Sequence, residues 1–150
     1  MTQDVITRAE ALSRFNKAGY GLLNADSRLR GRATQIHGAL STSHARALKS
    51  LVDYGDLSVN QLAEYVENKA AAVTQLVNGM EKNGYVERIK TNQDRRVVTI
   101  RITARGLDVY RQYEMKLSQL QNAELERFSA EELNTAAEIL NRMSSILDRL

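Results

Sequence analysis

The sequence predicts a mostly α-helical protein of the α+β class, with a single β-hairpin set between helices. Proline, which interrupts helices, is absent from the 150 residues, and Leu, Ala, Glu, Gln and Arg, which favour helices, are common. Apolar residues recur at helical spacing in most of the chain, but between residues 85 and 102 they alternate as in strands. No repeat, linker or low-complexity segment divides the sequence, and we expect one domain of residues 1–150.

Two helices are expected before residue 57. From Val5 to Arg32, apolar residues at spacings of three and four form a helical stripe. A second stripe follows Ser41, a favoured N-cap residue, and stops at Gly55, because glycine readily adopts the left-handed conformation that ends helices. The apolar residues of this second stripe are Ala45, Leu48 and Val52.

A short helix, a break and a longer helix are expected next. Ser58 and Gln61 have the spacing of a capping box, ahead of an apolar stretch that ends near Val66. After a break at residues 67–69, the segment 70–82 repeats apolar residues at the intervals of one buried helical face and stops at Asn83-Gly84. The residues of this face are Val73, Leu76, Val77 and Met80.

The alternating region predicts the β-hairpin. Residues 85–90 and 98–102 each alternate apolar and polar side chains, and the polar segment 91–96 joins them. Between Arg88 and Arg105, six basic residues are accompanied only by the acidic Asp94. The hairpin and its tip are therefore expected to be strongly basic.

Helical spacing returns from Thr103 to Phe128, and Ser129 with Glu132 forms a second capping-box pattern. Beyond it, apolar residues alternate gaps of three and four, as along the seam of a coiled coil. We expect a second copy of the chain to cover this seam and the N-terminal stripe, because one copy leaves both without a partner. The seam residues are Leu133, Ala136, Leu140, Met143, Leu147 and Leu150.

Charge is distributed unevenly along the chain. Residues 1–57 and 58–106 each contain eight Lys or Arg against five Asp or Glu, whereas residues 107–150 contain five against eight. A polyanionic partner would therefore bind the middle of the chain. Taken alone, such a basic run is equally typical of an ordinary solvated surface.

Several kinds of chemistry have no support in the sequence. Cysteine is absent, which excludes disulfides and thiol chemistry and is typical of a reducing compartment. His37 and His44 are the only histidines, and no tight cluster of carboxylates completes a metal site with them. No phosphate loop, nucleophile elbow or pair of catalytic carboxylates is found, so neither an enzyme nor a cofactor is predicted. Without a signal-peptide core or a membrane-length apolar stretch, we expect a cytoplasmic protein.

The order of elements is that of a helix-turn-helix followed by a β-hairpin wing, which is typical of proteins that bind double-stranded DNA. The major groove admits one α-helix, and a wing arginine gains from the negative potential of the neighbouring minor groove. The alternative is a dimeric protein-interaction adaptor without DNA binding, because polar residues occur on any solvated helix face. The outward residues of the 70–82 helix are Ala71, Thr74, Gln75, Asn78 and Lys82.

Motifs between residues 40 and 106 resemble the MarR family of winged-helix regulators, and the order of helices is similar over the whole chain. Leu62-Ala63-Glu64, Val73-Thr74-Gln75-Leu76-Val77 and the segment 80–88 look like that family's recognition helix and first wing strand. Asp94-Arg95-Arg96, followed by an alternating strand and a Thr-x-x-Gly motif at 103–106, is similar to its wing signature.

This resemblance implies a homodimer with residues 5–35 and 107–150 as intertwined dimerisation helices and residues 41–106 as the DNA-binding lobe. It also implies that Arg96 enters the minor groove and that Asp94 helps to orient it; we expect Arg95 to lie close to phosphates. Many members are repressors released by small, often anionic or aromatic, ligands. The expected function is thus a ligand-responsive repressor on a pseudo-palindromic operator, with no ligand-binding residue assigned.

The chain departs from the family pattern at the start of the recognition helix. Members usually carry Ser or Thr where this chain has Lys69, and polar residues where it has Ala70, Ala71 and Ala72. We therefore expect weaker base recognition at that end, or a helix capped by Asn68. The expected DNA-binding residues are Lys69, Ala71, Thr74, Gln75, Asn78, Lys82, Asp94, Arg95 and Arg96.

Overall fold

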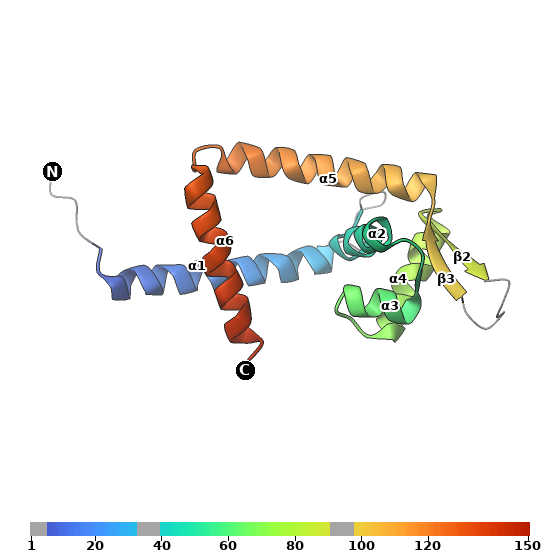
Figure 1. The fold of residues 1–150 in the computed structure, drawn as a ribbon, viewed down its shortest axis with the longest axis horizontal. Coiled ribbons are helices and arrows are strands. Elements are labelled where there is room, and N and C mark those ends of the chain that lie inside the picture. Colours follow the sequence, from blue (N-terminus) through green and yellow to red (C-terminus); the bar gives the residue numbers. More distant parts are fainter. Residues whose placement is uncertain (1–5, 33–39, 91–97) are drawn as a thin grey trace. The chain divides into compact units, whose positions relative to one another are not determined.

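The computed structural model describes residues 6–32, 40–90 and 98–150, and the chain divides into two compact units, residues 1–111 and 112–150 (Figure 1). Most of the described residues are helical, and the strands form one small sheet, as the sequence predicts. In chain order the elements are α1 (Arg8–Arg32), α2 (Thr42–Tyr54), β1 (Leu57–Ser58), α3 (Val59–Tyr65), α4 (Ala70–Lys82), β2 (Val86–Lys90), β3 (Val98–Ile102), α5 (Ala104–Leu125) and α6 (Ala130–Leu147).

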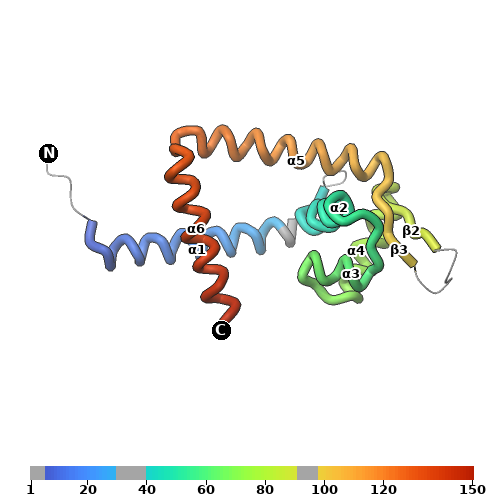
Figure 2. The backbone as a smooth tube through the Cα atoms, viewed as in Figure 1, coloured from blue at the N-terminus to red at the C-terminus, as the bar shows by residue number. Residues whose placement is uncertain are grey.

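The main hydrophobic core lies in residues 41–106, which we call the winged lobe. Figure 2 traces the chain through α2, α3 and α4 and then along the two strands of the hairpin. The three helices contact one another and the sheet, so that the core lies between them. Its fully buried large side chains are Leu48, Leu51, Leu62, Val73, Val77, Met80 and Ile100.

Side-chain caps fix where α2 and α3 begin. The Ser41 hydroxyl accepts a hydrogen bond from the His44 N–H at 3.0 Å, which satisfies a donor that the first helical turn leaves free. Ser58 and Gln61 form both hydrogen bonds of a capping box, at 3.1 and 2.9 Å. Both predicted helix starts are confirmed.

The C-terminus of α4 forms a Schellman motif around Gly84. The N–H groups of Gly84 and Tyr85 donate to the carbonyl oxygens of Glu81 and Met80, each at 2.9 Å. Gly84 has φ = 74°, which a residue with a side chain rarely adopts. The predicted helix end at Asn83-Gly84 is therefore confirmed.

The sheet is antiparallel, with strand order β1-β3-β2. β2 and β3 pair from Val86 opposite Ile102 to Lys90 opposite Val98, which confirms the hairpin. β1 was not predicted: Leu57 lies opposite Ile100, and two residues are too few to show an alternating pattern. The tip of the hairpin, residues 91–97, lies outside the described residues.

A single residue, Thr103, joins β3 to α5. Its N–H donates to the Tyr85 carbonyl at 3.0 Å, and its hydroxyl donates to the Gly84 carbonyl at 2.6 Å and accepts from the Gly106 N–H at 3.0 Å. A β-carbon at Gly106 would lie 2.0 Å from the Tyr85 carbonyl oxygen. The Thr-x-x-Gly pattern thus has a geometric cause, because only glycine permits this approach of helix and turn.

Helix α1 begins at Arg8, and the expected start at Val5 was too early. Thr7 and Glu10 exchange cap hydrogen bonds, N–H to carboxylate at 2.9 Å and N–H to hydroxyl at 3.2 Å, which place Thr7 at the N-cap position. Asp26 of α1 lies 3.7 Å from the Arg46 guanidinium of α2. Residues 1–5 and 33–39, into which the expected N-terminal segment extends, are not described.

In the second unit, α6 begins with the predicted capping box of Ser129 and Glu132. Because Ser129 adopts an extended conformation there, α5 has to stop before it, and it ends at Leu125 rather than at the expected Phe128. Within α6, all of which the structure describes, no residue is buried.

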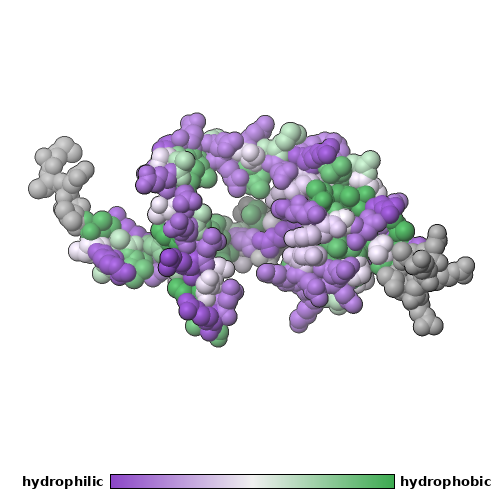
Figure 3. All heavy atoms as spheres, in the orientation of Figure 1, coloured by the Kyte–Doolittle hydropathy of each residue, from purple (hydrophilic) through white to green (hydrophobic). Residues whose placement is uncertain are grey.

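Apolar side chains on the terminal helices lie at the surface. Leu133, Leu140 and Leu147 of α6 are 40, 49 and 51% exposed, and hydrophobic residues also lie on the surface of α1 (Figure 3). None of the described helices is long and apolar enough to cross a membrane.

Candidate nucleic-acid interface

Helix α4 has one buried face and one exposed face. Val73, Val77 and Met80 are fully buried in the lobe, which fixes the rotation of the helix about its axis. The predicted base-reading residues lie on the other side and are all exposed: Ala71, Thr74, Gln75, Asn78 and Lys82. The Thr74 hydroxyl donates to the Ala70 carbonyl at 2.9 Å, as a helical threonine often does.

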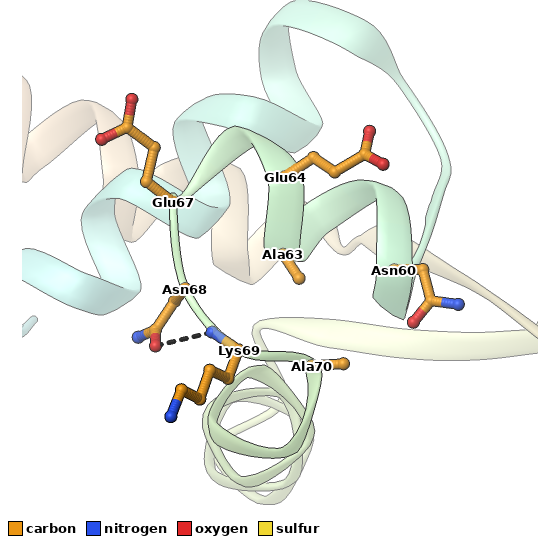
Figure 4. Close-up of a pocket in the computed structure, with 7 residues that line it drawn as sticks. All are labelled: Asn60, Ala63, Glu64, Glu67, Asn68, Lys69 and Ala70. Atoms are coloured by element: carbon orange, nitrogen blue, oxygen red, sulfur yellow. Dashed lines mark hydrogen bonds between the residues drawn. The ribbon is translucent and has the colours of Figure 1, made fainter. Parts of the chain in front are cut away.

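The N-terminus of α4 is capped differently from the expectation. Lys69 occupies the N-cap position, and its side chain makes no cap hydrogen bond. Asn68 is not the cap: its side-chain oxygen accepts from the Lys69 N–H at 2.8 Å, one residue before the helix (Figure 4). Glu64 and Glu67, which line the same open hollow, point away from the exposed Lys69. A lysine at the positive end of a helix dipole is unfavourable unless an anion lies nearby.

One exposed residue of α4 has a partner on the hairpin. A guanidinium nitrogen of Arg88 on β2 donates to the Asn78 side-chain oxygen at 2.6 Å, and the other terminal nitrogen forms an ion pair with Glu81. Arg88 is partly buried, with 29% of its side chain exposed. In the sequence, Arg88 stands out only as part of a basic run and of the segment 80–88, and helical or strand spacing gives no sign of this contact.

The basic run has less free charge than its sequence suggests. Arg101 on β3 forms two hydrogen bonds at 2.6 and 3.0 Å with one carboxylate oxygen of Asp56, and this hydrogen bonding raises the pKa of Arg101. Arg105 lies over the Tyr85 ring, with 5.8 Å from guanidinium carbon to ring centre. Asp94, Arg95 and Arg96 lie outside the described residues, so their predicted roles remain predictions.

His44 is a partly buried residue on α2 that faces the recognition helix. A β-carbon built on Gly79 of α4 would lie 3.6 Å from the His44 Nε2. Burial lowers the pKa of the His44 imidazole below its ordinary value of 6.5, so the ring is neutral at pH 7. His37 is not described. Among the described residues, no three His, Asp or Glu side chains are grouped to hold a metal ion.

Comparison with known proteins identifies the family. Residues 40–98 match the MarR family. The HTH-type transcriptional regulator YfiV of Bacillus subtilis, which is described as uncharacterized, is 30% identical over 110 residues, or 73% of this chain and 68% of YfiV. The chain belongs to the MarR family. It is therefore a transcriptional regulator and not an enzyme.

Solved structures of other proteins share the fold along most of the chain. Streptococcus pneumoniae FabT, solved in complex with DNA, has a TM-score of 0.73 at 20% identity and covers 92% of this chain and 98% of its own. Bordetella bronchiseptica BpsR, whose DNA binding is regulated by 6-hydroxynicotinic acid, has a TM-score of 0.66 at 18% identity, with 85% and 98% covered. These likenesses confirm the predicted winged-helix fold.

Proposed function

We propose that this MarR-family regulator is a homodimeric repressor that binds a pseudo-palindromic operator in double-stranded DNA and responds to a small molecule. The observation that carries the proposal is the two-sided recognition helix. Val73, Val77 and Met80 hold α4 in the lobe, and its opposite face presents hydrogen-bonding side chains and a methyl group to solvent. An α-helix with such a face fits the major groove.

The exposed face of α4 supplies groups suited to base edges and phosphates. Gln75 and Asn78 carry amides that bond base edges, and the Ala71 methyl suits the thymine methyl. Lys69 and Lys82, at the two ends of the helix, suit phosphates, which would also offset the cost of a lysine at the helix N-terminus. FabT, which shares the fold, binds DNA.

The hairpin is the proposed contact with the minor groove. Lys90 of β2 lies opposite Val98 of β3, and in the sequence residues 91–97 connect the two strands. We propose that Arg96 enters the minor groove, that Arg95 lies near phosphates and that Asp94 orients Arg96, as in similar family members. Arginine suits this place because it stays charged and its planar group fits a narrow groove.

Dimerisation is supported by the apolar residues that one chain leaves exposed. Leu140 and Leu147 on α6, and Leu12, Leu22 and Leu29 on α1, are between 48 and 60% exposed. Such faces in a regulator are expected to pack against a second copy. In this proposal residues 5–35 and 107–150 form the dimer, residues 41–106 bind DNA, and half-site centres are about 10 bp apart.

A small-molecule effector is supported only by similarity to proteins such as BpsR. We assign no residues to its binding. The proposed effect of the ligand is to change the affinity of the dimer for its operator.

The test is a titration of binding with salt, on duplex DNA from upstream of the protein's own gene and on random duplex. The wild type is expected to prefer the upstream DNA, and Gln75→Ala should lose affinity for it more than for random DNA. Arg96→Ala should flatten the slope of log affinity against log salt by about one unit for each wing, and Asp94→Ala should have a milder effect. Arg101→Ala is the matched control, because Arg101 is paired with Asp56. Equal binding to both DNAs would overturn sequence-specific recognition, and no binding to either DNA would favour the adaptor alternative.

A further inference from the structure

Three side chains connect the recognition helix to the hairpin: Asn78 and Glu81 on α4 and Arg88 on β2. Arg88 donates to the Asn78 side-chain oxygen at 2.6 Å through one terminal nitrogen and pairs with the Glu81 carboxylate through the other. Asn78 and Glu81 lie one helical turn apart, so one planar guanidinium spans both. All three residues lie in the unit formed by residues 1–111.

The contact with Arg88 determines which way the Asn78 amide faces. Arginine has five N–H donors and no acceptor, so only the amide oxygen of Asn78 can face it. The amide nitrogen, with its two hydrogens, then points away from Arg88. Because Arg88 can only donate, it determines which end of the Asn78 amide is the oxygen and which is the nitrogen.

Glu81 holds Arg88 in this position. The carboxylate and the amide oxygen each accept one hydrogen bond from a different terminal nitrogen of the guanidinium, and a hydrogen bond between two charged groups is the stronger kind. The Arg88 side chain is also only 29% exposed, whereas Lys69 and Lys82 are exposed. These features distinguish Arg88 from a side chain that is free to bind a phosphate.

We propose that Arg88 is a positioning residue that makes Asn78 a hydrogen-bond donor toward DNA and so determines which base Asn78 recognises. This inference rests on the proposed DNA binding. Guanine presents two acceptors in the major groove, N7 and O6, which match the two hydrogens of the amide nitrogen. The usual pairing of asparagine with adenine requires the amide oxygen to accept from N6. That oxygen already accepts from the guanidinium of Arg88, so adenine N6 has to compete for its remaining lone pair. At the operator position that Asn78 contacts, guanine is therefore preferred to adenine, and cytosine, which offers only a donor, is disfavoured.

The experiment measures the affinity of the full chain for operator duplexes in which each base pair is changed in turn. The wild type should show a symmetric pair of positions at which guanine binds about tenfold more tightly than adenine or cytosine. In Asn78→Ala this preference should disappear. In Arg88→Met, which keeps an unbranched side chain but removes the donors, the amide is released and the preference should shift from guanine toward adenine.

A double variant shows whether Arg88 acts through Asn78. Adding Arg88→Met to Asn78→Ala should change the base preference no further. The salt dependence of binding should stay unchanged in Arg88→Met, because Arg88 touches no phosphate in this proposal. Arg101→Met is the matched control, since it removes an ion-paired arginine from the neighbouring strand, and it should leave the base preference intact.

The outcomes separate the inference from the function it rests on. If the wild type binds no DNA sequence better than random duplex, the proposed function fails and the inference fails with it. If binding is specific but the position that depends on Asn78 prefers adenine, or no position depends on Asn78, only the inference is overturned. The inference alone is also overturned if Arg88→Met keeps the wild-type base preference. It is likewise overturned if Arg88→Met flattens the slope of log affinity against log salt, as the loss of a phosphate contact would.

Discussion

In the winged lobe, Leu48, Leu62 and Ile100 are completely buried, whereas in α6 the leucines of the seam are about half exposed. Each region has one helix that begins with a capping box, α3 at Ser58 and α6 at Ser129. These two helices therefore start in the same way, and the regions differ in how far their apolar side chains are buried. The lobe buries its apolar residues within one chain, whereas α6 leaves an apolar stripe exposed, which the proposed dimer would cover.

The difference separates two sources of stability in this regulator. The lobe gains its free energy of folding from contacts within the chain, so its stability should not depend on protein concentration. Helices that are covered only in a dimer gain theirs on association, and their stability rises with concentration. The following predictions compare matched positions in the two regions.

The largest effect is expected from truncating the core leucine Leu48. Leu48→Ala leaves a cavity in the lobe and should lower the free energy of unfolding by about 2–5 kcal/mol at any protein concentration. Leu140→Ala should lower stability in a concentration-dependent way, because its proposed cover is a second copy. Denaturant unfolding at a low and a high protein concentration measures both, and a Leu140→Ala effect that is the same at both concentrations would count against the dimer.

Glycines in the winged lobe and in α1, the other helix with exposed apolar residues, should respond with opposite signs. Gly106→Ala places a methyl group 2.0 Å from the Tyr85 carbonyl oxygen, and moving the backbone apart should cost about 1–3 kcal/mol or more. Gly21→Ala in α1 meets no atom within 4 Å and should stabilise the helix by about 0.5–1 kcal/mol. Thermal melting of the two variants decides this, and a neutral Gly106→Ala would show that the close approach does not constrain the lobe.

The two capping boxes allow a comparison at the next smaller scale. Replacing the cap with alanine costs about 1 kcal/mol in a typical helix. Ser58→Ala should show this loss in the unfolding of the lobe, and Ser129→Ala should show it as weaker dimerisation, measured by analytical ultracentrifugation. If Ser129→Ala left the dimer constant unchanged while Ser58→Ala destabilised the lobe, α6 would have no part in the interface.

The smallest effect concerns pH and belongs to the lobe alone. Because burial lowers the pKa of His44 in the folded state, the unfolded chain binds a proton more readily. The contribution of a neutral His44 to the free energy of unfolding is therefore fully present above the unfolded pKa of 6.5, and it is lost as the pH falls below this value. His44→Gln should reduce the loss of stability between pH 7.5 and pH 5.5, measured by denaturant unfolding, and an unchanged loss would contradict this role of His44.

Local signals made much of the fold predictable. Ser41, Ser58 and Ser129 each mark a helix start, because a side-chain cap involves residues only three apart in sequence. The hairpin followed from alternation and a polar connection, and its register is regular. The two-residue β1 was not predicted because it is too short for a pattern. The start of α1 at Arg8 was missed although Thr7 and Glu10 have the spacing of a capping box.

The candidate site was predictable only in part. Helical spacing correctly placed Thr74, Gln75 and Asn78 on the exposed side of α4, because that side is opposite the buried one. Spacing could not show that Arg88 bonds to Asn78, or that Arg101 pairs with Asp56 from 45 residues away. Contacts of this kind depend on the tertiary fold, and here they change both the free charge and the hydrogen-bonding character of the proposed interface.

The joint at Thr103 has a mechanical consequence. Three hydrogen bonds and the closeness of Gly106 to the Tyr85 carbonyl restrict bending between β3 and the first turn of α5. These hydrogen bonds would have to break before the joint could serve as a hinge. While they hold, a rotation of the first turn of α5 would turn β3 with it. For a regulator, this restricted joint would pass a small displacement of the first turn of α5 on to β3.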